Sequence, residues 1–280
     1  MLTPEIVLLG GPNSGKTHYT GQLYGRLQRN PGTLRLRGAP ADLSAFQEVL
    51  RCLENGNAAS HTPHGTWSEV CLPLQDENGR AMDLSWPDYG GEQLKQVIST
   101  RSVDLAWQAR LCKAKGWLLL IRLKAEVTFP DALEKLAEHP HCGEPSVSRV
   151  STWDANAYWV EKLQILLHVA KLGIVKPLER PRLAILLSCY DELGESTATP
   201  AEELARKLPL VASFIRSNWH KDEVSIWGLS SLGQELTDNS GVEVFIDEGP
   251  EHQGWVVMPH GGDRTQDLSL PLKWLLDGIA

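Results

Sequence analysis

The chain has 280 residues, of which 42% are apolar, so it can bury the core of one large α/β domain or of two small domains. Its formal net charge of -8 and its pI near 5.6 argue against general binding to nucleic acid or to anionic lipid, since both require a basic surface. The longest apolar runs, 117–121 and 183–187, are far shorter than the roughly 20 residues of a membrane-spanning helix.

The N-terminus and the cysteines indicate a cytoplasmic protein. The first predicted strand begins near residue 6, which leaves no room for a signal peptide. The five cysteines are widely spaced and form no Cys-x-x-Cys pair, so we expect neither a disulfide framework nor a zinc site. The one ligand-like cluster, His139-Pro140-His141-Cys142, is better explained as a polar loop tip than as a metal site.

The N-terminal half alternates apolar runs with helical patterns. Its predicted elements, in order, are a buried strand at 6–9, a helix at 17–30, a short edge strand at 34–37, an inserted helix at 41–55, antiparallel strands at 67–74 and 81–86 joined at Asn78-Gly79, a helix within 93–114 and a buried strand at 117–123.

The C-terminal half continues the alternation. Its predicted elements are a polar insertion at 124–152 with a helical piece near 132–138, an amphipathic helix at 156–172, a strand at 183–187, helices within 200–219 interrupted by Pro209, a core strand at 224–228, an inserted hairpin with strands at 242–246 and 255–258, and a helix at 270–276.

This order of elements predicts an α/β fold. We expect one domain over 1–280, built on a mostly parallel sheet with one antiparallel hairpin and with helices on both faces. Insertions are expected at about 31–58, 124–152 and 236–260. Ligands of such sheets bind in the crevice outside the carboxyl ends of the strands.

A phosphate-binding loop is predicted directly after the first strand. The segment Gly10-Gly11-Pro12-Asn13-Ser14-Gly15-Lys16-Thr17 has the spacing Gly-x-x-x-x-Gly-Lys-Thr and precedes a helix. Its glycines allow successive N–H groups to point inward, and the helix start adds its positive dipole end. Lys16 would reach the β- and γ-phosphates, and the Thr17 hydroxyl would bind Mg²⁺.

A second motif follows the hairpin. In Asp88-Tyr89-Gly90-Gly91 the aspartate is suited to hold Mg²⁺ through water, and the Gly91 N–H is suited to contact the γ-phosphate. The Asp-x-x-Gly pattern also occurs by chance in turns, but its place directly after a strand, with Glu92 next, favours the functional interpretation.

Two later strand ends carry candidates for contacts with a base. The Asp191 carboxylate can accept the N1–H and N2–H of guanine and would repel the acceptor edge of adenine. Ser230 and Ser231 can offer backbone N–H groups to the base oxygen. Taken singly, a helix-capping aspartate and a serine turn explain these residues equally well.

With these motifs in this order, the chain resembles P-loop GTPases of the translation-factor and Ras-like class. More narrowly, it looks like the bacterial double-GTPase family. The segments that carry this likeness are Leu8-Leu9-Gly10-Gly11-Pro12-Asn13-Ser14-Gly15-Lys16-Thr17, Trp86-Pro87-Asp88-Tyr89-Gly90-Gly91-Glu92, Trp255-Val256-Val257-Met258-Pro259 and Asp267-Leu268-Ser269-Leu270-Pro271-Leu272-Lys273-Trp274-Leu275-Leu276. The resemblance implies GTP/GDP and Mg²⁺ as cofactors and a nucleotide-dependent switch. It also implies a protein partner, such as another GTPase or an effector of a bacterial conflict or signalling system.

The chain departs from such GTPases at two places. Where they carry Asn-Lys-x-Asp, it has Ser188-Cys189-Tyr190-Asp191, so guanine preference depends on Asp191 alone. Where Ras-like proteins place a water-positioning glutamine, it has Glu92. A carboxylate near the γ-phosphate is repelled unless it is protonated or paired, so either Glu92 acts as a base or intrinsic hydrolysis is slow.

Other roles stay open on the sequence alone. Thr62 or Thr66 would complete the Mg²⁺ shell, with Thr66 preferred because it stands at the predicted strand start. Arg101 is a candidate arginine finger, but a surface ion pair explains it better. Four of the ten tryptophans fall on predicted strands and are expected in the core: Trp67, Trp86, Trp117 and Trp227. Three near the insertions are candidates for a partner surface: Trp153, Trp159 and Trp255.

The sequence thus predicts a GTP-binding switch protein that binds and slowly hydrolyses GTP with Mg²⁺, with Lys16 and Glu92 as catalytic residues. A nucleotide-binding interaction module without turnover is one alternative, since Glu92 and the changed base motif depart from active GTPases. A P-loop ATPase or kinase is the other, although no compact arginine-rich lid is visible.

Overall fold

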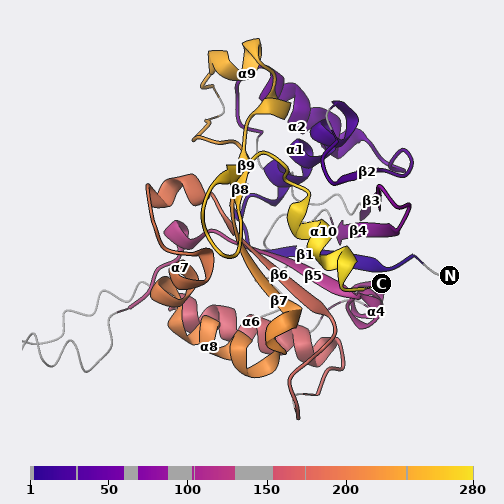
Figure 1. The fold of residues 1–280 in the computed structure, drawn as a ribbon, viewed down its shortest axis with the longest axis vertical. Coiled ribbons are helices and arrows are strands. Elements are labelled where there is room, and N and C mark those ends of the chain that lie inside the picture. The colour runs from indigo at the N-terminus through magenta and orange to yellow at the C-terminus, as the bar shows by residue number, and fades with distance from the viewer. Residues whose placement is uncertain are drawn as a thin grey trace, which may run out of the picture.

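The computed structural model describes residues 3–29, 31–59, 69–87, 103, 105–129, 154–173, 175–237 and 239–279. Within these ranges, nine strands form one sheet in the order β2-β3-β4-β1-β5-β6-β7-β8-β9 (Figure 1). The strands are β1 (Glu5–Gly10), β2 (Leu34–Leu36), β3 (Glu69–Asp76), β4 (Ala81–Pro87), β5 (Gly116–Ile121), β6 (Arg182–Ser188), β7 (Val224–Ser230), β8 (Trp255–Val257) and β9 (Arg264–Thr265).

Helices lie on both faces of this sheet (Figure 1). In the described ranges the α-helices are α1 (Lys16–Arg29), α2 (Ser44–Glu54), α4 (Leu105–Lys113), α6 (Ala155–Val169), α7 (Pro200–Lys207), α8 (Pro209–Asn218), α9 (Glu243–Asp247) and α10 (Leu270–Asp277). Side chains of α4, α6, α7 and α8 share one buried cluster with one face of the sheet, and those of α1 and α10 share another with the opposite face.

The centre of the sheet is parallel. Strands β4, β1, β5, β6 and β7 run in the same direction, with β1 between β4 and β5. Every residue of β5 and β6 is buried, which explains why these strands read as continuous apolar runs rather than as alternating ones. Each fully buried leucine or isoleucine in them contributes about 1.5–3 kcal/mol of transfer free energy. The α/β fold expected from the sequence is confirmed.

The predicted hairpin is also confirmed. Strands β3 and β4 pair antiparallel, with Leu74 opposite Met82. Gly79 has a φ of 76°, the left-handed conformation that the Asn-Gly signal predicts. The buried Asp76 carboxylate accepts the N–H groups of Asn78 and Arg80 and so fixes the turn.

Proline and capping residues set the helix boundaries at 200–218. Helix α7 begins in a capping box, in which Thr199 accepts the Glu202 N–H while Glu202 accepts the Thr199 N–H. Pro209 separates the two helices, because α7 ends before it and it is the first residue of α8. The interruption predicted at Pro209 is therefore confirmed.

The hairpin predicted within 236–260 is wrong. Residues Glu243–Asp247 form the short helix α9, in which Phe245 is fully buried while 41% of Val244 and 54% of Ile246 is exposed. Phe245 packs with Val49 and Leu53 of α2, and this tertiary contact overrides the strand-like alternation. The second predicted strand exists as β8, but it pairs antiparallel with β7 and β9.

Several predictions lie outside the described residues, among them the helical piece near 132–138 and most of the helix within 93–114. The single domain and its three insertions stay predictions. Among the residues that the structure describes, no helix is long and apolar enough to cross a membrane.

Candidate functional site

The phosphate loop joins β1 to α1, as its sequence context predicts. Asn13 has a φ of 55° and Gly15 a φ of 78°, so two left-handed residues turn the chain within three positions. Gly10 allows a close approach as well, because a Cβ there would lie 2.6 Å from the Ser14 hydroxyl oxygen. The Ser14 hydroxyl donates to the Gly11 carbonyl at 2.8 Å and closes the loop on itself.

The loop fits an anion. In the described part of the chain, no acceptor takes the backbone N–H groups of Asn13, Ser14 and Gly15. Free N–H groups at a helix start attract negative charge. The Lys16 ammonium lies at the same loop and donates to the Gly10 carbonyl at 2.9 Å and to the Gly11 carbonyl at 2.7 Å. These residues could therefore cradle a phosphate, and the neighbouring Thr17 hydroxyl is available for a cation beside it.

The end of β6 reaches this loop. A Cβ built on Gly15 would lie 3.8 Å from the Ser188 Cβ, so the start of the 188–191 motif lies beside the phosphate loop. Cys189 follows with a φ of 50°, and Asp191 lies in the 3-10 helix η2 (Tyr190–Leu193). Burial raises the pKa of the Cys189 thiol to about 11. The Cys189 side chain is thus an uncharged residue where the resemblance leads one to expect a lysine.

The end of β7 supplies the serine loop. Ser230 is the last residue of the strand rather than the first of the loop, and its hydroxyl accepts the Gly233 N–H at 2.9 Å. Ser230 and Ser231 are both buried. Gly254 packs tightly on them, since a Cβ there would lie 2.3 Å from the Ser231 carbonyl oxygen. Segment 253–255 therefore forms one wall of the serine loop.

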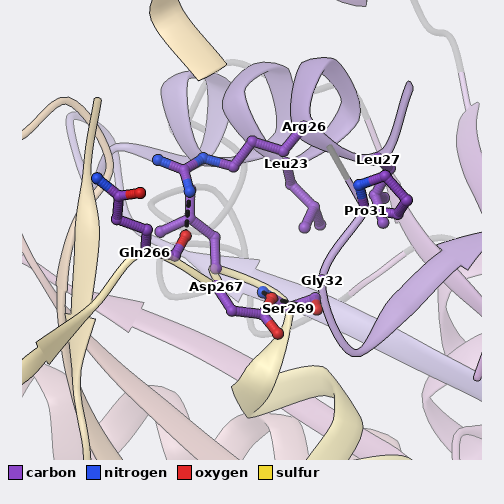
Figure 2. A pocket seen from close by; sticks show the side chains of 9 residues that line it. Leu23, Arg26, Leu27, Pro31, Gly32, Gln266, Asp267 and Ser269 are labelled. Carbon is purple, nitrogen blue, oxygen red and sulfur yellow. Dashed lines mark hydrogen bonds between the residues drawn. The ribbon is translucent and has the colours of Figure 1, made fainter. Parts of the chain in front are cut away.

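A buried arginine of α1 holds that wall. Arg26 is 8% exposed and donates to the carbonyls of Gln253, Gly254 and Gln266. Figure 2 shows its side chain reaching from α1 toward Gln266. Burial lowers the pKa of Arg26 to about 10, which leaves it charged at neutral pH. The helix that begins at the phosphate loop is thereby tied to the serine loop.

Neither described cavity is lined by a residue of the phosphate loop. The cavity of Figure 2, between α1 and segment 266–269, has a volume of about 110 Å³, whereas pockets for small molecules have about 300–1,000 Å³. A cavity of about 520 Å³ lies among α7, α8 and the first residues of β7, and none of its lining residues belongs to the phosphate loop.

The predicted switch and magnesium-binding residues that follow the phosphate loop lie outside the described ranges. These residues are Thr62, Thr66, Asp88, Gly91, Glu92 and Arg101. Their roles stay predictions.

The tryptophan assignments are confirmed in part. Trp86, Trp117 and Trp227 are buried, as expected for strand residues. Trp159, expected at a partner surface, is only 2% exposed and belongs to the core under α6, so that prediction is wrong. Trp255 is half-buried between Tyr190, at 6.4 Å between ring centroids, and the Arg264 guanidinium, at 4.1 Å from the ring. Trp67 and Trp153 lie outside the described residues.

Two more cations near the strand ends escaped the sequence interpretation. Lys162 of α6 is buried, lies 4.1 and 4.2 Å from the ring centroids of Tyr158 and Trp159, and would be 3.5 Å from a Cβ on Gly11. Arg122 follows β5 and pairs with Glu192, next to Asp191. Neither belongs to a motif, and only the tertiary structure places them here.

Comparison with known proteins decides the family. A family model for Double-GTPase 1 matches residues 7–275. The chain belongs to this family. Family membership makes it a GTPase-type domain, implies a guanine nucleotide and places it among nucleoside-triphosphate hydrolases. No curated protein matches the chain in sequence.

Solved structures of GTPases are similar to the chain in fold. The Arl6 BBS3 small GTPase from Trypanosoma brucei, with bound GppNp, is 13% identical with a TM-score of 0.39, over 90% of this chain and 99% of that one. The GTP-bound Ski7 GTPase-like domain from S. cerevisiae is 13% identical with a TM-score of 0.45, over 89% of this chain and 50% of that one. The bacterial selenocysteine-specific elongation factor EF-Sec is 13% identical with a TM-score of 0.38, over 82% of this chain and 26% of that one. The family assignment depends on the family model alone.

Proposed function

We propose that this Double-GTPase 1 protein is a switch that binds GTP with Mg²⁺, hydrolyses it slowly and controls a protein partner. The observation that supports the proposal is the phosphate loop. Among the described residues, three of its N–H groups have no acceptor, the Lys16 ammonium binds two of its carbonyls, and the end of β6 lies beside it. Membership of the family supplies the nucleotide class.

The phosphate end has a defined division of labour in this proposal. The N–H groups of Asn13, Ser14 and Gly15 bind phosphate oxygens, and Lys16 exchanges its carbonyl partners for the β- and γ-phosphates. Thr17 would hold Mg²⁺ together with Asp88 and Thr66, and the ion would neutralise charge between these phosphates. Gly91 would contact the γ-phosphate and Glu92 would orient or deprotonate the attacking water.

The base end has a weaker set of contacts. Asp191 would accept the two donors on the guanine edge, and the Ser230 and Ser231 N–H groups would donate to its oxygen. Loss of the γ-phosphate would release the loops near Thr66 and Asp88 and so change the surface offered to the partner. A second GTPase or an effector is the kind of partner that we propose.

Nucleotide binding to purified protein tests the proposal. We expect Mg²⁺-dependent binding of GTP and GDP that is lost in Lys16→Ala. Lys176→Ala, at an exposed loop position, is the matched control and should bind as the wild type does. Equal affinity for ATP and GTP would contradict the guanine assignment, and unchanged binding in Lys16→Ala would contradict the phosphate loop.

Single-turnover hydrolysis separates a slow GTPase from a module without turnover. Bound GTP should convert to GDP slowly in the wild type, and more slowly still in Glu92→Ala. No conversion over many hours, with or without a partner, would leave a binding module as the function.

A further inference from the structure

The loop that carries Asp191 has an unusual local structure. Cys189 is held at a φ of 50°, a conformation that non-glycine residues rarely adopt. Ser188, which occupies the asparagine position of Asn-Lys-x-Asp, has a buried hydroxyl without a hydrogen-bond partner among the described residues. The Ser188 hydroxyl therefore does not order the loop by hydrogen bonding.

An ion pair from the neighbouring strand end contacts this loop. Arg122 directly follows β5, and its Nε donates to Oε2 of Glu192 at 3.1 Å while its Nη2 donates to Oε1 of the same carboxylate. Such a two-point pair fixes direction as well as distance, because both groups are planar. Arg122 and Glu192 keep only 33% and 13% of their side chains exposed. The pair is therefore better shielded from water and salt than a surface ion pair.

The backbone around Glu192 links this ion pair to Asp191. Its N–H donates to the Cys189 carbonyl at 3.0 Å, and the Gly194 N–H donates to the Asp191 carbonyl at 3.2 Å. The first bond closes the turn 189–192 and the second closes the turn 191–194, so Asp191 belongs to both turns. Fixing the Glu192 side chain to the end of β5 thus fixes the backbone of the preceding residue.

We propose that Arg122 and Glu192 are positioning residues that set guanine selectivity by holding the backbone at Asp191 in place. The inference rests on the proposed function and concerns only its base end. It predicts that loss of the pair lowers the selectivity for guanine over adenine without lowering the affinity for phosphates.

The test compares Kd values for GTP, ATP and inorganic tripolyphosphate, measured with Mg²⁺ by calorimetry on the full chain. In Arg122→Ala we expect the ratio of the ATP Kd to the GTP Kd to fall at least tenfold, with the tripolyphosphate Kd unchanged. The exchanged pair Arg122→Glu with Glu192→Arg should recover part of the ratio, and Glu192→Gln should behave as Arg122→Ala does. Arg37→Ala, which breaks the exposed Arg37–Asp83 pair on β4, is the matched control and should leave all three values unchanged.

The outcomes separate the inference from the function on which it rests. Wild-type selectivity that survives Arg122→Ala overturns the inference and leaves the proposed function standing. An equal loss of affinity for all three ligands also overturns it, because that pattern marks general damage to the site. Wild-type protein that binds GTP and ATP equally overturns both.

Discussion

Replacing Gly254 by alanine should destabilise the protein through two separable effects. Gly254 has a φ of 84°, and an alanine in the left-handed region costs about 1–2 kcal/mol. The new Cβ would also lie 2.3 Å from the Ser231 carbonyl oxygen and 2.9 Å from that of Ser230. These are backbone atoms that cannot rotate away, so the collision adds about 1–3 kcal/mol, the usual cost of overpacking.

A second glycine supplies the control. Gly262 has a φ of 95°, and a Cβ there would meet nothing within 4 Å, so Gly262→Ala carries the backbone cost without the collision. Urea unfolding followed by tryptophan fluorescence should place Gly262→Ala about 1–2 kcal/mol below the wild type. Gly254→Ala should fall at least about 1 kcal/mol further.

Nucleotide affinity provides a second measurement on the same variants. Because Gly254 packs on the serine loop, its replacement should displace Ser230 and Ser231 and raise the Kd for GTP. This Kd is measured without denaturant, at a temperature at which both variants are folded. Gly262→Ala should leave that Kd unchanged. Equal unfolding free energies for the two variants would refute the assigned collision.

Three other features give sharp expectations. Burial raises the pKa of the Asp76 carboxyl, but hydrogen bonds from Arg80 outweigh this effect, so the pKa in the folded protein is lowered. The stability that Asp76 adds is therefore present above its unfolded pKa of about 3.9 and is lost as the pH falls through the folded pKa. Asp76→Asn should therefore flatten the fall in urea midpoint on acidification, and an unchanged slope would contradict this. Phe245→Ala should cost about 3 kcal/mol in unfolding free energy, against about 0.5 kcal/mol or less for its exposed neighbour in Ile246→Ala; similar values would show that α9 does not pack on α2. With its pKa near 11, the Cys189 thiol should be alkylated by iodoacetamide at pH 8 on the order of 100-fold more slowly than in the urea-unfolded chain, and comparable rates would mean that its pKa is not raised.

The elements that the sequence predicted are those whose signals are local. The apolar runs of β1, β5 and β6 are buried on both faces, so burial alone marks them. The turn at Asn78-Gly79 and the helix break at Pro209 follow from the backbone preferences of single residues. The phosphate loop could be predicted for the same reason, because the residues that form its turn and those that start its helix are adjacent in the sequence.

The errors arose where tertiary contacts decide the structure. The alternation around Phe245 is that of a strand, yet only the apolar surface of α2, nearly 200 positions away in the chain, makes a single helical turn the better solution. Trp159 stands beside a predicted insertion, but α6 directs its ring inward. The partner of β8 is likewise undetermined by its own residues, since an apolar strand of three residues can pair with any open edge.

This division between local and distant signals also separates the two ends of the proposed nucleotide site. The phosphate end consists of eight consecutive residues and can therefore be predicted from the sequence. The base end depends on pairs that the chain brings together from afar: Arg122 and Glu192 are 70 positions apart, and Arg26 and Gly254 are 228 apart. A motif comparison registers only that two residues of Asn-Lys-x-Asp have changed. The fold places an ion pair beside Asp191 and places Gly254 against Ser230 and Ser231, so loss of the motif does not by itself imply loss of base recognition.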